Sequence, residues 1–448
     1  MLVRDVRHMD ELASKAKRRR AGMPAYHAFI AENPPMLMKC VYPGIVQLHK
    51  LRAFEAVAQH GNVHRAARAI HLSQPAVSRA VRQLEETLGA VLFERNTKGM
   101  TLTDEGRLVL RCVQRALGEL RSAEREIRSL AGEARDGVRP GRVSDVITER
   151  MLWALVAIAR YGGESAAAAM LQVTQPALNR TLRQLEELAA VDLFVRSGRG
   201  TRLTETGEVL LRHAKLALAE IRVATEELAS MRGRLNGRLV VGALPLSSGY
   251  LVPAAVGRTL KAHPDLSISI IDGTYATLSY GLRCAEVNVI VGALRADDQE
   301  PYALHEPLFA DSLNVVARAH HPVLRRGALT GLHELRDEPW VLPLAGTPSR
   351  MAFERAFRAE GVEPPQVAVE ANSPSIVRAL LLSSDRLALL STRQVQQELQ
   401  HGILSVLPVP VSLRDTQRSI GLAYLRDSDP SPAMAAFLAA LRQTVAVG

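Results

Sequence analysis

The chain has 448 residues, which is too long for one ordinary hydrophobic core, so we expect roughly two to four domains. An apolar content of 47% with 23% charged residues is normal for a soluble globular protein. Residues 1–236 hold 37 Lys and Arg against 26 Asp and Glu, whereas residues 237–448 hold 19 against 20. The basic front half therefore predicts a polyanionic partner that the neutral rear half does not share.

Composition also excludes several kinds of site. Cys40, Cys112 and Cys284 are widely spaced and belong to no Cys/His cluster, which argues against a disulfide framework and a structural metal. No run of about eighteen apolar residues could span a membrane. Residues 1–46 form a basic arm that we expect to be disordered, and the arm lacks a signal-peptide core. We therefore predict a cytoplasmic protein with no metal, no cofactor and no membrane contact.

The front half contains a tandem repeat. Shifting the sequence by 101 positions aligns Ser73–Gly106 with Thr174–Gly207 without a gap, and 16 of the 34 positions are identical. The same shift pairs Leu51 with Leu152. Such identity at a fixed offset indicates a duplicated domain.

Local signals in the first copy predict two short helices in succession. An alanine-rich helix runs from Ala66 to Ile70, after an earlier helix that ends at Gly61. Ser73 is a good N-cap and Pro75 suits the first turn of a helix, so residues 74–88 form a further helix.

Two short strands complete the predicted module. Residues 91–93 and 100–102 are expected to pair around a turn at Asn96–Gly99. A short helix, a tight turn, a second helix and a basic wing together predict a winged helix-turn-helix. The second helix of such a module enters the major groove of DNA by its N-terminal end.

Polar residues at the start of that helix and basic residues on the wing are candidates for DNA contact. Glutamine pairs bidentately with adenine, and arginine reads guanine or holds phosphate. In the first copy the candidates are Ser73, Gln74, Pro75, Ser78, Arg79, Arg82, Arg95 and Lys98. In the second copy they are Thr174, Gln175, Pro176, Asn179, Arg180, Arg183, Arg196 and Arg199. The second copy has Ala189 in place of the helix-closing Gly89, and its second helix is nearly all alanine, so it is either a second DNA reader or a scaffold.

A long helix is expected after each wing, over residues 107–136 and 208–234. Apolar residues recur along both helices at spacings of four and three. A seam of this period needs a partner helix. The partner remains open, because the helices can pair within one chain, pair between chains, or pack on their own domains.

The pattern changes at Gly237, where strands begin to alternate with helices. Buried strands are expected at 238–243, 267–271 and 288–292, with a polar loop at Leu246–Gly249. This order is typical of an α/β fold with parallel strands and crossover helices.

Both halves resemble one family. The run AARAIHLSQPAVSRAVRQLEETLGAVLFERNTKGMTLTDEG resembles the N-terminal domain of LysR-type regulators, and GRLVVGALP, EPWVLPLAGTPSR and SDRLALLS resemble their effector domain. The resemblance implies two winged helix-turn-helix domains with long linker helices that dimerise, then an α/β periplasmic-binding-protein-like effector domain of two subdomains. The implied domains are 1–46, 47–106, 107–136, 147–207, 208–234 and 237–448, with subdomain I at 237–317 and 413–448 and subdomain II at 318–412.

In such an effector domain a ligand lies at the carboxyl ends of strands, beside helix N-termini. Several strand ends carry hydroxyl groups there. The candidate effector-binding residues are Ser247, Ser248, Thr274, Thr347, Ser349 and Ser373. Short hydroxyls beside helix starts favour an anion, above all a carboxylate, although each can also be an ordinary N-cap. We predict a small organic or aromatic acid as the effector.

Other functions agree less well with the sequence. An enzyme would need a catalytic motif that we do not find, and a transport solute-binding protein would need a signal peptide. A redox sensor would most simply use two cysteines in the effector domain, where Cys284 stands alone. A structural DNA-bridging protein with a vestigial sensor domain remains the alternative. We predict a sequence-specific, nucleoid-associated transcriptional regulator, not an enzyme, with double-stranded DNA, the effector, RNA polymerase and further copies of the chain in a dimer or tetramer as partners.

Overall fold

The computed structural model describes residues 47–96, 99–132, 143–197, 200–295, 300–327, 329–366, 368–410 and 416–447. The chain forms two compact units, Met1–Arg234 and Leu235–Gly448, and each is described by itself. The basic arm predicted at residues 1–46 lies outside the described residues.

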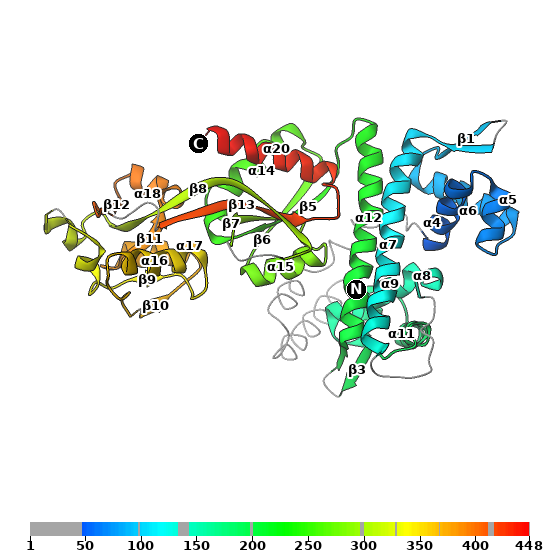
Figure 1. The fold of residues 1–448 in the computed structure, drawn as a ribbon, viewed down its shortest axis with the longest axis horizontal. Helices are drawn as coiled ribbons and strands as arrows, with labels where there is room; N and C mark the ends of the chain where they lie inside the picture. The colour runs from blue at the N-terminus through cyan, green and yellow to red at the C-terminus, as the bar shows by residue number, and fades with distance from the viewer. Residues whose placement is uncertain are drawn as a thin grey trace, which may run out of the picture. The chain divides into compact units, whose positions relative to one another are not determined.

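The first module has the predicted order of helices and strands (Figure 1). Its elements are α4 (Leu48–His60), α5 (Val63–Ala69), α6 (Gln74–Leu88), β1 (Phe93–Asn96) and β2 (Gly99–Leu102). The prediction for residues 74–88 is confirmed, because α6 has these bounds and the Ser73 hydroxyl accepts the Ala76 N–H at its start. Gly89 ends α6 in the left-handed region with a φ of 60°.

The wing begins two residues later than predicted. Leu92 and Phe93 donate their backbone N–H groups to Oε1 of Glu85, at 2.8 and 3.3 Å. Because Leu92 also accepts the N–H of Thr103 through its carbonyl, residues 91–92 join α6 to the wing. The strand proper pairs Phe93 with Leu102.

The second module repeats these elements at the same offset. They are α9 (Glu149–Tyr161), α10 (Glu164–Met170), α11 (Gln175–Ala189), β3 (Phe194–Ser197) and β4 (Gly200–Leu203). The residue that takes the place of Gly89 is Ala190 and not Ala189, since Ala190 caps α11 in the left-handed region at a φ of 54°. Both copies keep a glycine after the wing, at Gly106 and Gly207. A Cβ atom at these two positions would lie 2.1 and 2.2 Å from the carbonyl oxygens of Leu92 and Leu193, respectively.

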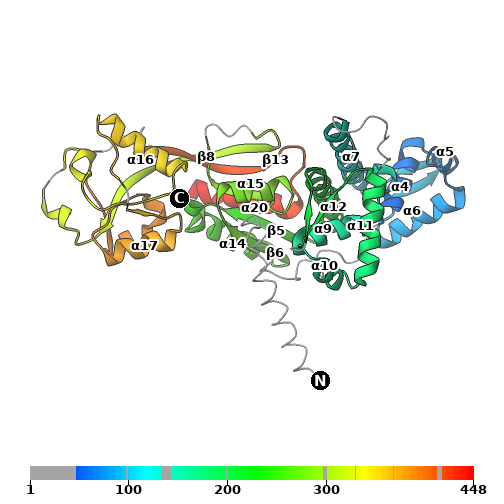
Figure 2. The same ribbon diagram turned by 90° about the horizontal axis from the view of Figure 1, so that it is seen from below.

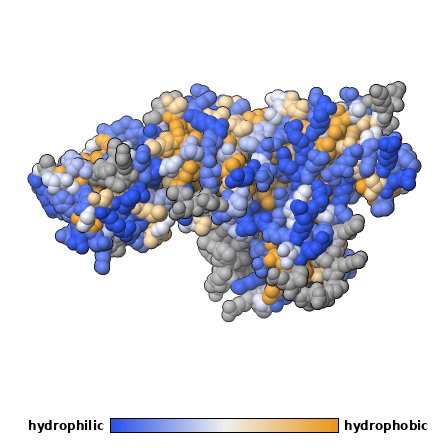
Figure 3. All heavy atoms as spheres, viewed as in Figure 1, coloured by the Kyte–Doolittle hydropathy of each residue, from blue (hydrophilic) through white to orange (hydrophobic). Residues whose placement is uncertain are grey.

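Each wing leads into a long helix, α7 (Asp104–Gly132) and α12 (Glu205–Met231). The two helices lie side by side and run in opposite directions, because Arg232 reaches Glu105 while Arg212 reaches Glu126 (Figure 1). Their apolar seams join residues of both modules in one continuous hydrophobic core. Hydrophilic residues predominate over these helices on the face drawn in Figure 3.

The modules also contact each other away from the long helices. Arg52 of α4 donates to the carbonyls of Ser144 and Ile147, at 2.8 and 3.0 Å. Ser144 belongs to the short helix α8 (Val143–Val146), which precedes α9. The N–H of Leu48 reaches Oε2 of Glu149 at 3.3 Å. The two modules of one chain therefore form a single body.

The second unit has a sheet whose strands follow the order β11-β8-β13-β7-β5-β6, with β12 paired to β8. The strands are β5 (Gly237–Ala243), β6 (Leu266–Asp272), β7 (Val289–Ala293), β8 (Ala303–Arg318), β11 (Ala388–Ser391), β12 (Leu404–Val406) and β13 (Gln417–Leu425). The predicted parallel strands are confirmed, since β5 pairs in parallel with both β6 and β7. The long strands β8 and β13 are antiparallel to each other and run through both subdomains (Figure 2).

Each subdomain has its own apolar core. In subdomain I, α14 (Leu251–Ala262) and α20 (Pro432–Val447) pack on the sheet, and α15 (Tyr275–Arg283) covers its other face. In subdomain II, Trp340 packs against Phe353 and Phe357 of α16 (Pro348–Ala359). The remaining elements of subdomain II include β9 (Val341–Leu342), β10 (Val369–Glu370), α17 (Pro374–Ser383), η3 (Thr392–Gln394) and α18 (Gln396–Gln400).

The prediction of a polar loop at Leu246–Gly249 is wrong in part. Residues Pro245–Ser248 form the short helix α13. Pro245 suits the first helical position, and Ser247 donates its hydroxyl to the carbonyl of Leu244, so this turn closes locally.

Candidate functional site

The N-terminal end of α6 is exposed, as base contact in the major groove requires. Gln74, Ser78 and Arg82 recur every four residues and so share one face of the helix. Ser73, Pro75 and Arg79 lie beside them and are exposed. No described residue forms an ion pair with Arg79 or Arg82, so both guanidinium groups are available to phosphate.

The second module places its candidates in the same way on α11. Thr174 caps the helix through the N–H of Ala177, and Pro176, Arg180 and Arg183 are exposed. Within the described part of the chain, Arg180 and Arg183 also have no carboxylate partner. Gln175 and Asn179 differ, because both are hydrogen-bonded to Glu164 of α10.

The wing candidates are partly outside what the structure describes. Lys98 and Arg199 lie outside the described residues, and for Arg95 the structure describes the backbone in β1 but not the side chain. Arg196 in β3 is 45% exposed and bonds Glu186 at 3.3 Å. Its guanidinium group is therefore partly neutralised before it meets any phosphate.

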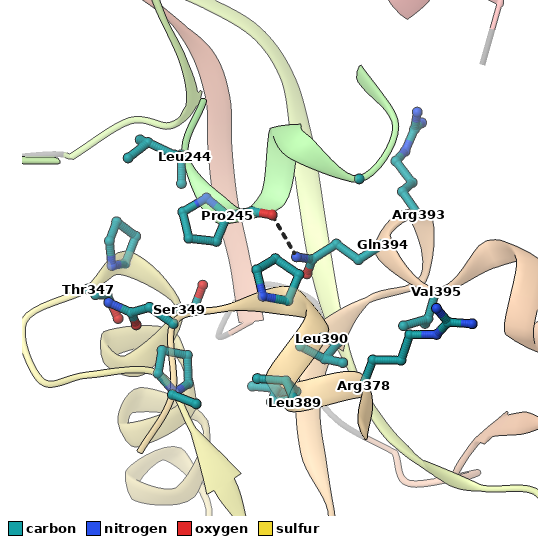
Figure 4. A pocket seen from close by; sticks show the side chains of 18 of the residues that line it. Leu244, Pro245, Thr347, Ser349, Arg378, Leu389, Leu390, Arg393, Gln394 and Val395 are labelled. Atoms are coloured by element: carbon teal, nitrogen blue, oxygen red, sulfur yellow. Dashed lines mark hydrogen bonds between the residues drawn. The ribbon is translucent and has the colours of Figure 1, made fainter. Parts of the chain in front are cut away.

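The second unit has a cavity of about 740 Å³ between its two subdomains (Figure 4). Apolar residues such as Leu244, Leu389 and Leu390 line it together with polar groups. Gln394 of η3 donates its side-chain amide to the carbonyl of Pro245 at 3.4 Å, which connects the two subdomains across the cavity. The size suits a small molecule.

Three of the predicted effector residues line this cavity. Thr274 and Thr347 cap α15 and α16, where their hydroxyls accept backbone N–H groups at 3.2 and 3.3 Å. Ser349 lies in the first turn of α16 and accepts a hydrogen bond from Arg418.

The other three predicted residues do not supply a described hydroxyl to the cavity wall. Ser247 is fully buried, and its hydroxyl lies 2.6 Å from the Val291 carbonyl, so it stabilises the turn after β5. The Ser373 hydroxyl is hydrogen-bonded to the Ser375 hydroxyl, and Ser375, not Ser373, lines the cavity. The side chain of Ser248 is outside the described part of the structure.

Sequence reasoning missed the charged residues of the cavity. Among the described lining residues the charged ones are Arg295, Arg378, Arg393, Arg418 and Glu398. Arg378 pairs with Glu398 at 2.6 Å, whereas Arg295 lies over the ring of Tyr275. The excess of positive charge favours an anionic ligand.

Arg418 forms the most buried ion pair of the cavity wall. Its guanidinium group lies 2.9 Å from Asp311, and the two side chains are 7% and 4% exposed. Burial lowers the pKa of Arg418, while the Asp311 carboxylate opposes that shift. Ser391 also donates to Asp311 at 2.7 Å. Strands β8 and β13 are thereby tied to β11 and α16 of subdomain II.

None of the described helices is both long and apolar enough to cross a membrane. No cluster of described His, Cys, Asp or Glu side chains could hold a metal ion. Cys112 and Cys284 are buried, and neither forms a disulfide within the described part of the chain.

Family models match both winged modules and the second unit. The model described as "Bacterial regulatory helix-turn-helix protein, lysR family" matches residues 48–107 and again residues 150–208. The model "LysR substrate binding domain" matches residues 232–446. The chain belongs to the LysR family of transcriptional regulators. As a LysR-family regulator it binds DNA, takes a small-molecule effector and forms oligomers, and it is not an enzyme.

Named relatives include both long and ordinary members of the LysR family. The transcriptional regulator GalR of Pseudomonas putida is 35% identical over 399 residues, which is 89% of this chain and 97% of GalR. PcaQ of Agrobacterium fabrum is 32% identical over 301 residues, 67% of this chain and 96% of PcaQ. A match over 89% of this chain has to include the second module and most of the first. The match to PcaQ, over 301 residues, is about as long as one module with its linker helix plus the effector domain.

A solved structure agrees with the fold. A full-length OxyR variant from Pseudomonas aeruginosa has a TM-score of 0.52 and 25% sequence identity, over 67% of this chain and 94% of the OxyR chain. The LysR architecture of helix-turn-helix, linker helix and effector domain is therefore confirmed, and this chain carries the first two parts twice.

Proposed function

We propose that each chain is a LysR-type regulator with two DNA-reading heads in one body. The observation that carries this proposal is the pairing of α7 with α12 within the chain, which joins both modules in one core. A single chain then holds two recognition helices, α6 and α11, in a fixed relation. In this proposal the domains keep the boundaries predicted from the sequence, with modules at 47–106 and 147–207 and the effector domain at 237–448.

Direct contacts to DNA come from the exposed starts of the two recognition helices. Gln74, Arg79 and Arg82 supply them in the first module, and Arg180 and Arg183 in the second. Their exposure and the absence of carboxylate partners among the described residues support this assignment. The target is the chromosome, so the protein acts in the cytoplasm at the nucleoid and meets RNA polymerase there.

The effector is a small organic or aromatic acid in the cavity between the subdomains. Arginine side chains, the threonine caps of α15 and α16, and the apolar floor of Leu389 and Leu390 support an apolar body with a carboxylate. Binding closes the cleft, and the changed subdomain angle alters the arrangement of the heads.

Oligomers are proposed to form through the effector domains. The apolar seams of α7 and α12 face each other within the chain, so they are not free for a second chain. A dimer of such chains presents four heads.

A footprint on the DNA upstream of the chain's own gene tests the two-headed model. We compare the wild type with Arg79→Ala/Arg82→Ala and with Arg180→Ala/Arg183→Ala. If both variants lose protection, each in a different part of the footprint, both modules contact DNA. If the second variant protects all that the wild type does, the second module is a scaffold and the model is wrong.

Thermal unfolding with a panel of carboxylates tests the effector class. Aromatic and aliphatic acids should raise the melting temperature of the effector domain, and amides of the same shape should not. Arg378→Ala should weaken the response, with Arg358→Ala on the exposed face of α16 as the control. Stabilisation by neutral analogues alone would contradict an acid effector.

A further inference from the structure

The two modules differ at a position beside the recognition helix. Helix α5 of the first module begins at Val63, whereas α10 of the second begins at Glu164. Val63 packs against the shared apolar core. Glu164 is 17% exposed, its Oε1 atom lies 3.8 Å from Nε of Arg196 in β3, and its Oε2 atom faces α11.

Glu164 holds the polar side chains with which α11 would read bases. Its Oε2 atom accepts from Nδ2 of Asn179 at 2.8 Å and from Nε2 of Gln175 at 3.3 Å. The Ser165 hydroxyl donates to the amide oxygen, Oε1, of Gln175 at 2.9 Å. Both groups of the Gln175 amide are thus engaged, although a bidentate contact with adenine needs both free.

The first module leaves the equivalent groups unengaged. Gln74 and Ser78 of α6 have no hydrogen-bond partner for their side chains among the residues that the structure describes. The difference follows from the sequence at two neighbouring positions, where the first module has Val63 and His64 in place of Glu164 and Ser165.

Charge on the helix that precedes each recognition helix points the same way. Helix α5 carries His64, Arg65 and Arg68, and the equivalent positions of α10 are Ser165, Ala166 and Ala169. In a helix-turn-helix this first helix crosses the phosphate backbone. Basic residues there release counterions from DNA, whereas an acidic residue repels phosphate.

We propose that Glu164 makes the two heads of one chain unequal by holding Gln175 and Asn179 away from the bases. The first module then reads sequence, and the second contributes backbone contacts through Arg180 and Arg183. The operator is accordingly asymmetric, with one strongly and one weakly specified half-site per chain. This inference rests on the proposed two-headed contact with DNA.

A purely structural role for Glu164 makes a different prediction. Glu164 lies in the first turn of α10, where a carboxylate favours the helix dipole, and Gly163 makes no side-chain cap bond such as Asn62 makes in the first module. If that were its whole role, removing it would lower stability and leave DNA affinity unchanged or reduced.

The test uses the full chain and duplexes that the wild type selects from a random-sequence pool. Glu164→Val installs the residue of the first module, and Glu164→Gln removes the charge but keeps a hydrogen-bonding group. Glu187→Gln removes one charge from the exposed far end of α11 and is the matched control. Each variant is made with and without Arg180→Ala/Arg183→Ala, and melting temperatures show that all are folded.

Glu164→Val should bind about tenfold more tightly, which is the size of one restored base contact, and a new selection should sharpen the preference at the second half-site. Glu164→Gln should gain less, and Glu187→Gln should be unchanged. Arg180→Ala/Arg183→Ala should cost more affinity in the Glu164→Val background than in the wild type.

Unchanged or weaker binding by a folded Glu164→Val chain overturns the inference, including the case in which Glu164 itself reads cytosine. Tighter binding without a sharper preference at the second half-site also overturns it, because release of Arg196 from Glu164 would give that result. The two-headed proposal is judged separately, because it fails when the Arg180→Ala/Arg183→Ala change has no effect in either background. If that change matters in the wild type while Glu164→Val does nothing, the two heads stand and the role of Glu164 is wrong.

Discussion

The first and second modules share the contacts that build their backbones and differ in the side chains of two surfaces. Glu85 and Glu186 each accept two N–H groups at the start of the wing, and the wings have the same register. Glycine is retained at 106 and 207, where any Cβ would collide with a carbonyl. The recognition surface and the long-helix interface have diverged. Duplication thus preserved what the fold needs and changed what each copy meets.

The long-helix interface shows this divergence most clearly. His213 of α12 contacts the carboxylates of Glu119 and Glu126 of α7 at 2.6 and 3.2 Å. The equivalent residue of α7 is Cys112, whose sulfur lies 4.0 Å from Glu227 of α12. A pair of two α7 helices would place Cys112 against Glu119 and Glu126 and would lose the histidine contacts. The interface therefore favours the pairing of α7 with α12 over the pairing of two α7 helices.

Truncating the seam should have the largest effect and should be unequal between the copies. Leu120 of α7 is 1% exposed, whereas the equivalent Ile221 of α12 is only partly buried. Leu120→Ala should lower the free energy of unfolding of the first unit by about 2–5 kcal/mol, and Ile221→Ala by less. Hydrogen exchange of α7 and α12 peptides in the full chain measures both. Equal losses would contradict the asymmetric interface.

Removing the histidine should have the next largest effect. His213→Ala removes the imidazole that Glu119 and Glu126 share as a hydrogen-bond partner, so we expect the free energy of unfolding to fall by about 2 kcal/mol. Cys112→Ala removes a smaller group and a weaker contact and should cost about 1 kcal/mol. Urea unfolding of the full chain compares the two variants. A greater loss of unfolding free energy for Cys112→Ala than for His213→Ala would show that the histidine contacts are not the stronger ones.

Alkaline pH should distinguish the copies through Cys112. Burial, assisted by the nearby Glu227 carboxylate, raises the pKa of the Cys112 thiol from 9.0 to about 12. The unfolded chain ionises this thiol first, so the stabilising contribution is complete below pH 9 and is lost as the pH rises towards 12. By pH 10 the loss should be about 1 kcal/mol. The Cys112→Ala chain should lack this loss of stability at alkaline pH. If the wild type and the Cys112→Ala chain lose stability identically with pH, the role of the thiol is contradicted.

The smallest effect is expected at the ends of the recognition helices. Ala190 adopts a φ of 54°, which costs a residue with a Cβ atom, whereas Gly89 adopts 60° freely. Ala190→Gly should stabilise the second module by up to about 1 kcal/mol, and Gly89→Ala should destabilise the first by a similar amount. Thermal unfolding of both variants checks the opposite signs.

Local signals predicted much of the first unit. Ser73 and Pro75 were sufficient to place α6, because a cap and a first-turn proline act within one helical turn. The wing strand was placed too early because the Glu85 side chain, seven residues away, binds the N–H of Leu92. The sequence predicts a loop at Leu246–Gly249 and not the helix Pro245–Ser248, since a one-turn helix has no periodicity to detect.

The ligand cavity was predicted less completely. Thr274, Thr347 and Ser349 are at the wall as expected, because hydroxyl groups at helix starts are recognisable in a sequence. The arginines were missed because Arg295, Arg378, Arg393 and Arg418 come from separate segments that only the folded sheet and its two subdomains bring together.

The sequence by itself determined the duplication, the winged modules and the α/β effector domain, since these depend on short-range pattern and repeat. Only the tertiary structure decided which helix α7 pairs with, because a seam of this period accepts any similar helix and the choice depends on contacts such as Arg212 with Glu126. The same holds for Glu164, whose effect on Gln175 and Asn179 depends on how α10 packs against α11. Long-range packing places these side chains together, and no local signal records it.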